Sequence, residues 1–200
     1  MFQKTPEDDK PAMSVDDNNF LRIMDIEVYI DDENHWVAPL PFRSPRRPLP
    51  NNREQASQRL LSLQCSFRRR PDMKEHFFDF MQKVTDNHQA EPAPQLQPGQ
   101  ECWYLPTFGV YHPKKHGKIR VVFDSSAEYK GTSLNDTLLS GPNLNNTLVG
   151  VLLRFRREQV AVTADVEQMF YGFKVREDHR HFLRFLWYKD NDSDKEIIDY

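Results

Sequence analysis

Apolar residues recur every three to four positions in two neighbouring stretches of the first half of the chain. The first stretch carries Ala56, Leu60, Leu63 and Phe67, and the second carries Phe77, Phe80, Met81 and Val84. This spacing places each set on one side of a helix. Asn51 or Asn52 can cap the first helix, and Pro71 ends it. Asp72 with Glu75 predicts a capping box for the second helix.

Shorter alternating segments predict strands elsewhere. Residues 26–30 and 36–38 alternate around the polar run 31–34, which predicts a hairpin after a short helix capped within residues 16–18. Further strands are predicted over 103–105, 109–111, 118–124 and 160–165, a helix over 144–155, and a terminal hairpin over 182–198. Because helices and strands segregate unevenly instead of alternating, the expected fold class is α+β.

Composition excludes several classes of protein. No apolar run approaches the roughly 18 residues that cross a bilayer, and residues 2–9 lack the apolar core of a secretory signal. Cys65 and Cys102 are too few for a disulfide framework and lack zinc-ligand spacing. We therefore expect an intracellular protein, cytoplasmic or nuclear, that is not secreted and has no membrane partner. Apolar residues make up only 38% of the chain, but the 12% aromatic content argues against disorder.

The net charge of −3 is unevenly distributed along the chain. Residues 1–35 hold ten acidic and three basic residues, whereas residues 102–189 hold thirteen basic and eight acidic ones. A basic segment that follows an acidic N-terminal segment is compatible with binding to phosphates. Ordinary soluble domains also carry mixed surface charge.

Two features of the basic segment are candidate metal-binding or nucleotide-binding sites. Asp165 ends the predicted strand 160–165, where a rigid strand can aim a carboxylate into a cleft and offer Mg²⁺ a hard oxygen ligand. A basic strand–turn–strand with Gly117 at its tip has a composition that can close over a triphosphate. Its cationic residues are Lys114, Lys115, Lys118 and Arg120. The ordinary alternatives are a turn-capping aspartate and solvated surface charge.

A series of short motifs distinguishes between these alternatives. In chain order they are WYLP (103–106), GVYHPKK (109–115), KIRVVFD (118–124), KGTSLND (130–136), GPNL (141–144), LVGVLLRFR (148–156), ADVEQMF (164–170) and FLRFLW (182–187). The series closely resembles the reverse transcriptase of BEL/Pao-type LTR retrotransposons over roughly residues 20–200. The upstream runs WVAPLPF (36–42) and LPNNR (49–53) resemble the lead-in of that family.

The resemblance implies a right-hand polymerase, entered through its fingers and reaching the first part of the palm. In this interpretation residues 1–19 are a disordered acidic N-terminus and residues 20–50 a hairpin with a proline-rich lead-in. Residues 51–100 are a helical lead-in and linker, and residues 101–200 the fingers and partial palm. The implied partners are an RNA or DNA template–primer and a deoxynucleoside triphosphate, and the remainder of the Pol polyprotein is absent.

The resemblance also implies roles for individual residues. Arg120 matches the fingers arginine that contacts the triphosphate, and Lys114 or Lys115 matches its lysine partner. Phe170 occupies the aromatic position that excludes a ribose 2′-OH, the group that distinguishes RNA from DNA precursors. The residues implied to lie near the template are Gly141, Pro142 and Asn143.

One departure from the family bears on catalysis. Asp165 matches the first catalytic aspartate, which binds both Mg²⁺ ions of the complete enzyme, and the Val166 backbone carbonyl matches a second ligand to one ion. The remaining carboxylates come from a downstream Tyr-x-Asp-Asp hairpin, which the chain does not reach before Tyr200. The sequence Tyr-Ile-Asp-Asp at 29–32 lies far upstream, and we interpret it as turn chemistry. Neighbouring strand residues point apart, so Glu167 is a poor substitute ligand, and at most a weak Mg²⁺ site is expected.

These observations give two functional hypotheses from different classes. The first is a fragment of a retrotransposon Pol polyprotein whose family reaction is RNA-directed DNA synthesis, and which is inactive alone. The alternative is a domesticated, non-catalytic module that binds nucleic acid or another partner. An ordinary structural α+β domain is a third interpretation, against which the ordered motif series argues.

Overall fold

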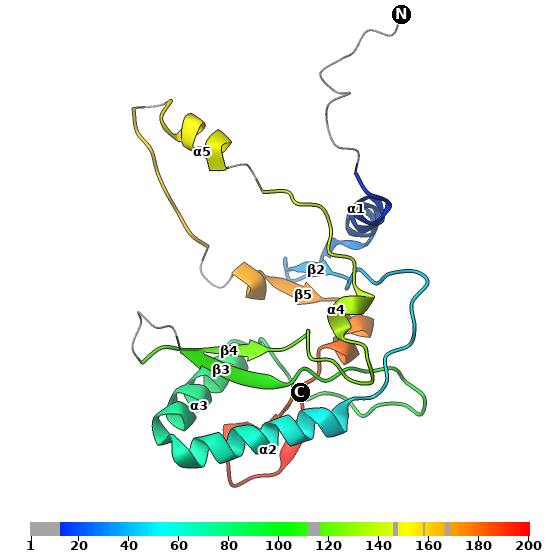
Figure 1. The fold of residues 1–200 in the computed structure, drawn as a ribbon, viewed down its shortest axis with the longest axis vertical. Coiled ribbons are helices and arrows are strands. Elements are labelled where there is room, and N and C mark those ends of the chain that lie inside the picture. The colour runs from blue at the N-terminus through cyan, green and yellow to red at the C-terminus, as the bar shows by residue number, and fades with distance from the viewer. Residues whose placement is uncertain (1–12, 112–116, 146–147, 158, 167–168) are drawn as a thin grey trace, which may run out of the picture. The chain divides into compact units, whose positions relative to one another are not determined.

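The computed structural model describes residues 13–111, 117–145, 148–157, 159–166 and 169–200 (Figure 1). Within these ranges the structure combines several helices with small sheets, so the expected α+β class is confirmed. The chain divides into two compact units. The smaller unit contains Met1–Pro41 and Leu139–Lys174, and the larger unit contains Phe42–Leu138 and Val175–Tyr200. No helix within the described ranges is long and apolar enough to cross a membrane.

The larger unit is built on two helices, α2 (Arg53–Arg69) and α3 (Pro71–Asp86), which pack against each other. The buried side chains of α2 are Ala56, Leu60, Leu63 and Phe67, and those of α3 are Met73, Phe77, Met81 and Val84. Both predicted helices are confirmed. The second stripe includes Met73 where the sequence analysis placed Phe80, because Phe80 lies at the flank of the stripe and is only half-buried against the core.

The helix α2 begins after Asn52, one of the two predicted caps, and the side chain of the other, Asn51, accepts a hydrogen bond from the Arg53 N–H at 2.9 Å. The Asn52 side chain makes no capping bond and binds the backbone of Tyr104 instead, accepting from its N–H at 2.7 Å and donating to its carbonyl at 2.8 Å. These two bonds satisfy an amide that is fully buried. The predicted capping box of Asp72 and Glu75 is wrong, because α3 begins at Pro71. Proline suits the first helical position, where its missing N–H needs no partner.

Two hairpins complete the larger unit. β3 (Thr107–Tyr111) pairs antiparallel with β4 (Ile119–Phe123), and β6 (Leu186–Tyr188) pairs antiparallel with β7 (Ile197–Asp199). Both hairpins were predicted, but the strand expected over 103–105 is reduced to one bridge between Tyr104 and Arg184. The helix α4 (Leu134–Thr137) and the 3₁₀ turns η2 (Glu177–Phe182) and η3 (Lys189–Asn191) lie in the connections.

Aromatic rings fill the core between these helices and hairpins. The ring of Phe77 on α3 stacks on Trp187 of β6 with 5.1 Å between centroids, and both side chains are at most 2% exposed. Phe185 stacks in the same way on Tyr200, at 5.5 Å. Burial of rings of this size supplies most of the stabilising free energy of a small core.

A charged side chain is also buried in this unit. Arg184 is 2% exposed, and its guanidinium lies 3.5 Å from the carboxylate of Asp199 on β7. Asp199 also accepts hydrogen bonds from the Tyr104 hydroxyl at 2.6 Å and from the Arg53 guanidinium at 2.9 and 3.1 Å. Burial and the bond to Asp199 raise the pKa of Tyr104 to about 12, so its hydroxyl remains a donor at neutral pH. The cluster ties the last strand to the start of α2.

The smaller unit begins with α1 (Val15–Glu27), which starts before the expected end of the N-terminal segment at residue 19. Ser14 and Asp17 form its capping box, so the cap lies slightly upstream of the predicted positions 16–18. The predicted hairpin follows as β1 (Tyr29–Ile30) and β2 (Trp36–Ala38), and β5 (Phe173–Val175) joins the same sheet. The unit also contains α5 (Leu148–Phe155), which the sequence predicted within 144–155, and the 3₁₀ turn η1 (Met169–Gly172).

The strand predicted over 160–165 does not form. These residues have neither helical nor strand structure, and Val160 and Val162 are 79% and 83% exposed. No strand of the described ranges pairs with this segment. β-branched residues favour strands mainly through packing against neighbouring strands, so the preference has no effect where that partner is lacking.

Candidate nucleotide and nucleic-acid site

The β3–β4 hairpin has one face toward the core of the larger unit. Gly109 pairs with Val121, and Tyr111 pairs with Ile119. A side chain at Gly109 would meet the Cδ1 atom of Ile119 at 2.5 Å and the Cε atom of Met73 at 3.3 Å. Glycine therefore lets the strand lie close to α3, and the hairpin is held against the helix by direct packing.

The opposite face of the hairpin is exposed. Val110 pairs with Arg120 and Phe108 pairs with Val122, so these four side chains share one face. Phe108 and Val110 are 42% and 46% exposed, and Arg120 is exposed as well. A guanidinium next to an exposed aromatic ring can bind a phosphate and offer a stacking surface to a base.

Side chains from the helices fix the hairpin where it approaches its turn. The Tyr111 hydroxyl and His76 Nδ1 are 2.9 Å apart, and the Arg70 guanidinium lies 5.1 Å above the Tyr111 ring. Burial and the carboxylate of Asp72 raise the pKa of Tyr111, and the nearby Arg70 charge opposes that rise. The strand end before residues 112–116 is thus anchored to α3 and to Arg70 at the junction of α2 and α3.

The sequence-predicted nucleotide contacts are only partly described. Arg120 lies in β4, within the predicted strand, and on the exposed face. Lys114 and Lys115 lie outside the described residues. Phe170 belongs to η1, but its side chain also lies outside the description. Phe108 was not singled out from the sequence, and the pattern of 107–111 would have placed its apolar side chain on the buried face, whereas Thr107 is buried and Phe108 is exposed.

The predicted catalytic position lies in the smaller unit, whereas Arg120 belongs to the larger one. Asp165 and Val166 are exposed residues in the segment that forms no strand. The rigid strand end that made Asp165 a candidate metal ligand is therefore not observed. Asp165 also belongs to no group of three ligand side chains within the described residues.

The predicted template contacts lie in the connection before α5. Gly141 has a φ of +71°, and a side chain there would meet the Phe20 ring of α1 at 2.9 Å. This glycine is thus required both by backbone conformation and by close packing. Asn143 accepts a hydrogen bond from the Asn145 N–H at 3.0 Å and is exposed, and Pro142 is half-buried.

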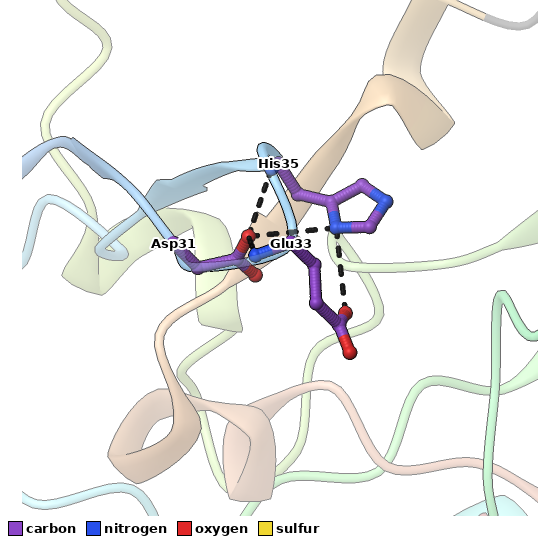
Figure 2. A group of neighbouring side chains, drawn as sticks. All are labelled: Asp31, Glu33 and His35. Carbon is purple, nitrogen blue, oxygen red and sulfur yellow. Dashed lines mark hydrogen bonds and ion pairs between the residues drawn. The ribbon is translucent and has the colours of Figure 1, made fainter.

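The acidic turn between β1 and β2 gathers Asp31, Glu33 and His35, with ligand atoms within 4.8 Å of one another (Figure 2). The Lys174 ammonium already binds both carboxylates there, at 2.9 Å from Asp31 and 2.7 Å from Glu33. A backbone bond from His35, together with Lys174, lowers the pKa of Asp31 to about 2. Asp31 also accepts from the backbone of Glu33, so the interpretation of 29–32 as turn chemistry agrees with the geometry.

Comparison of the chain with protein-family models, with curated proteins and with solved structures gives no match.

Proposed function

We propose that this chain forms the fingers and the first part of the palm of an RNA-directed DNA polymerase of the BEL/Pao reverse transcriptase type. The ordered series of motifs over residues 20–200 supports the proposal. The observation that carries it is the exposed face of the β3–β4 hairpin, where Arg120 lies beside apolar and aromatic side chains. Such a face suits a base with its attached phosphates.

The described residues suggest a division of tasks. Arg120 pairs with phosphate oxygens of the nucleotide, and Phe108 offers its exposed ring to a base. The packing of Gly109 against Met73, and the bond from Tyr111 to His76, hold this face in place on α3. These contacts bind and orient a substrate but supply no metal ligand.

Catalysis in this family requires Mg²⁺, which would activate the primer hydroxyl and stabilise charge on the transferred phosphate. Asp165 offers one hard oxygen ligand for such an ion, with the Val166 carbonyl beside it. A two-ion centre needs more carboxylates than this position supplies within the described residues. The proposal therefore includes that the chain alone does not extend a primer.

Fluorescence anisotropy with a labelled primer–template and the next complementary nucleotide tests the binding half of the proposal. Arg120→Ala should weaken nucleotide-dependent retention of the primer–template. Arg22→Ala removes another exposed arginine, on α1, and should leave retention unchanged. Equal affinities of the two variants would contradict the assignment of Arg120.

Primer extension with Mg²⁺ tests the catalytic half. The chain and its Asp165→Ala variant should both give no product above background. Product from the unmodified chain that disappears in the variant would show that the chain is catalytically active and requires Asp165, against the proposal. Nucleotide-dependent binding without extension supports the proposal. If the affinity for the primer–template changes neither on addition of the nucleotide nor in the Arg120→Ala variant, the alternative of a non-catalytic nucleic-acid-binding module is favoured.

A further inference from the structure

The helix α2 carries a concentration of positive charge that the hairpin site does not use. Residues 53–70 contain five arginines and a single acidic residue, Glu54, although the whole chain has a net charge of −3. The neighbouring helix is the reverse, since residues 71–86 hold four acidic and two basic residues. The charge of α2 is therefore a local property of that helix.

Part of this charge lies along one line of the helix surface. Gln55, Arg59, Ser62, Ser66 and Arg69 follow one another at spacings of four and three residues. This is the spacing of the buried stripe moved by one position, so the line runs about 100° around the helix from the core. Arg59, Ser62 and Arg69 are exposed, and Gln55 and Ser66 are half-exposed. We call these five residues the α2 strip.

The arginines of the α2 strip are available to a partner. Arg53 is engaged by Asp199, and Arg70 lies over Tyr111 and 3.7 Å from Asp72. By contrast, none of the ion pairs found among the described residues involves Arg59 or Arg69. At the N-terminal end of the strip, the Gln55 side chain donates to the backbone carbonyl of Glu128 at 2.6 Å, and Glu54 is the adjacent acidic residue.

The composition of the α2 strip fits one kind of partner. Arginine side chains contact phosphate oxygens, and such contacts do not depend on base sequence. The Ser62 and Ser66 hydroxyls already donate to the carbonyls of Gln58 and Ser62, so the two arginines supply the contacts. Arg59 and Arg69 lie about 15 Å apart along the helix axis, at 1.5 Å per residue, so they would contact separate phosphates. We propose that the α2 strip binds the phosphate backbone of a nucleic acid, as a surface additional to the β3–β4 hairpin.

A blunt RNA–DNA hybrid labelled with fluorescein is a suitable probe, because it has no recessed primer end for the proposed polymerase site. Each phosphate contact contributes about 0.9 to the slope of log K against log salt concentration. The double variant Arg59→Ala/Arg69→Ala should lower this slope by about 2. Between roughly 50 and 200 mM salt the original protein should lose about tenfold more affinity than the variant.

Two further variants serve as controls. Arg22→Ala/Lys83→Ala removes two exposed cations from α1 and α3 and should leave the slope unchanged. Arg59→Lys/Arg69→Lys keeps the charges and should retain most of the slope. Circular dichroism and thermal melting should show that all variants fold alike, since every altered side chain is exposed.

The outcomes separate this proposal from the polymerase assignment. If Arg120→Ala has no effect on nucleotide-dependent binding while Arg59→Ala/Arg69→Ala lowers the salt slope, the polymerase assignment is refuted and phosphate binding by the α2 strip is supported. If the strip variant and the Arg22/Lys83 variant lower the slope equally, the α2 strip is refuted. Displacement of the hybrid by polyglutamate as efficiently as by unlabelled hybrid would refute it also, because the surface would then accept acidic polypeptides.

Discussion

Asp199→Ala is expected to destabilise the larger unit strongly, because it leaves Arg184 buried without its counter-charge. The Arg184 side chain is 2% exposed, whereas that of Asp199 is 21% exposed. Removing one partner of a buried ion pair costs about 3 to 5 kcal/mol. The Arg53 bond adds less than about 1 kcal/mol, because Arg53 is half-exposed and its charge can be solvated. The loss is thus a large share of the about 5 to 15 kcal/mol that stabilises a typical domain.

Urea unfolding followed by tryptophan fluorescence measures this effect in the larger unit. Trp103 and Trp187 are 0% and 2% exposed there, so their emission shifts when the core opens. Asp194→Ala is the matched control, because Asp194 is an exposed aspartate in the loop of the same β6–β7 hairpin. Asp199→Asn keeps an acceptor for the Tyr104 hydroxyl and should lose less stability than Asp199→Ala. Equal midpoints for Asp199→Ala and Asp194→Ala would refute the role of the buried charge.

Two further predictions concern pH and packing. Burial and the adjacent Arg184 lower the pKa of His181, whose Nδ1 lies 3.0 Å from the guanidinium. Asp178 and Glu177 oppose this shift. The unfolded chain therefore takes up a proton near the ordinary pKa of 6.5 while the folded one does not, and stability should fall as the pH drops below 6.5. His181→Gln should remove this part of the pH dependence, and urea midpoints that change with pH as before would contradict it. Gly109→Ala should cost about 1 to 3 kcal/mol by overpacking against Ile119 and Met73, whereas Gly99→Ala meets no neighbouring atoms and changes only the backbone preference. A thermal melt that shows Gly109→Ala to be harmless would mean that α3 can move away.

The helical part of the larger unit was predictable because its pattern is local. The residues that α2 buries are the four apolar positions that its spacing marked. The segment 160–165 was mispredicted for the opposite reason, since its β-branched residues are favourable in a strand only beside another strand. The start of α2 at Asn52 was predicted, but the partner of the Asn52 side chain was not, because that side chain binds the buried backbone of Tyr104. That contact joins residues 52 positions apart, and no local pattern encodes it.

The candidate site was predictable only in part. The position of Arg120 on a strand followed from the β-branched run around it, and its exposure follows from alternation once the partner strand is known. Phe108 was missed because the sequence analysis started the preceding strand at Gly109, one residue after it. The salt bridge of Lys174 to Asp31 was also inaccessible, because the two residues lie 143 positions apart.

The two units differ in what holds them together, and this determines what each experiment tests. The larger unit contains a continuous aromatic core, and both the β3–β4 hairpin and α2 pack on it. In the smaller unit α1 and α5 bury no side chain completely, and Leu148 and Leu153 of α5 are 72% and 70% exposed. Burial of apolar area is the main source of stability, so α5 and the segment that carries Asp165 receive little of it. The proposed binding through Arg120 or the α2 strip therefore depends on a well-packed unit, whereas the metal ligand proposed at Asp165 lies in a poorly packed segment. A chain that binds nucleic acid but does not extend a primer is the outcome that this difference predicts.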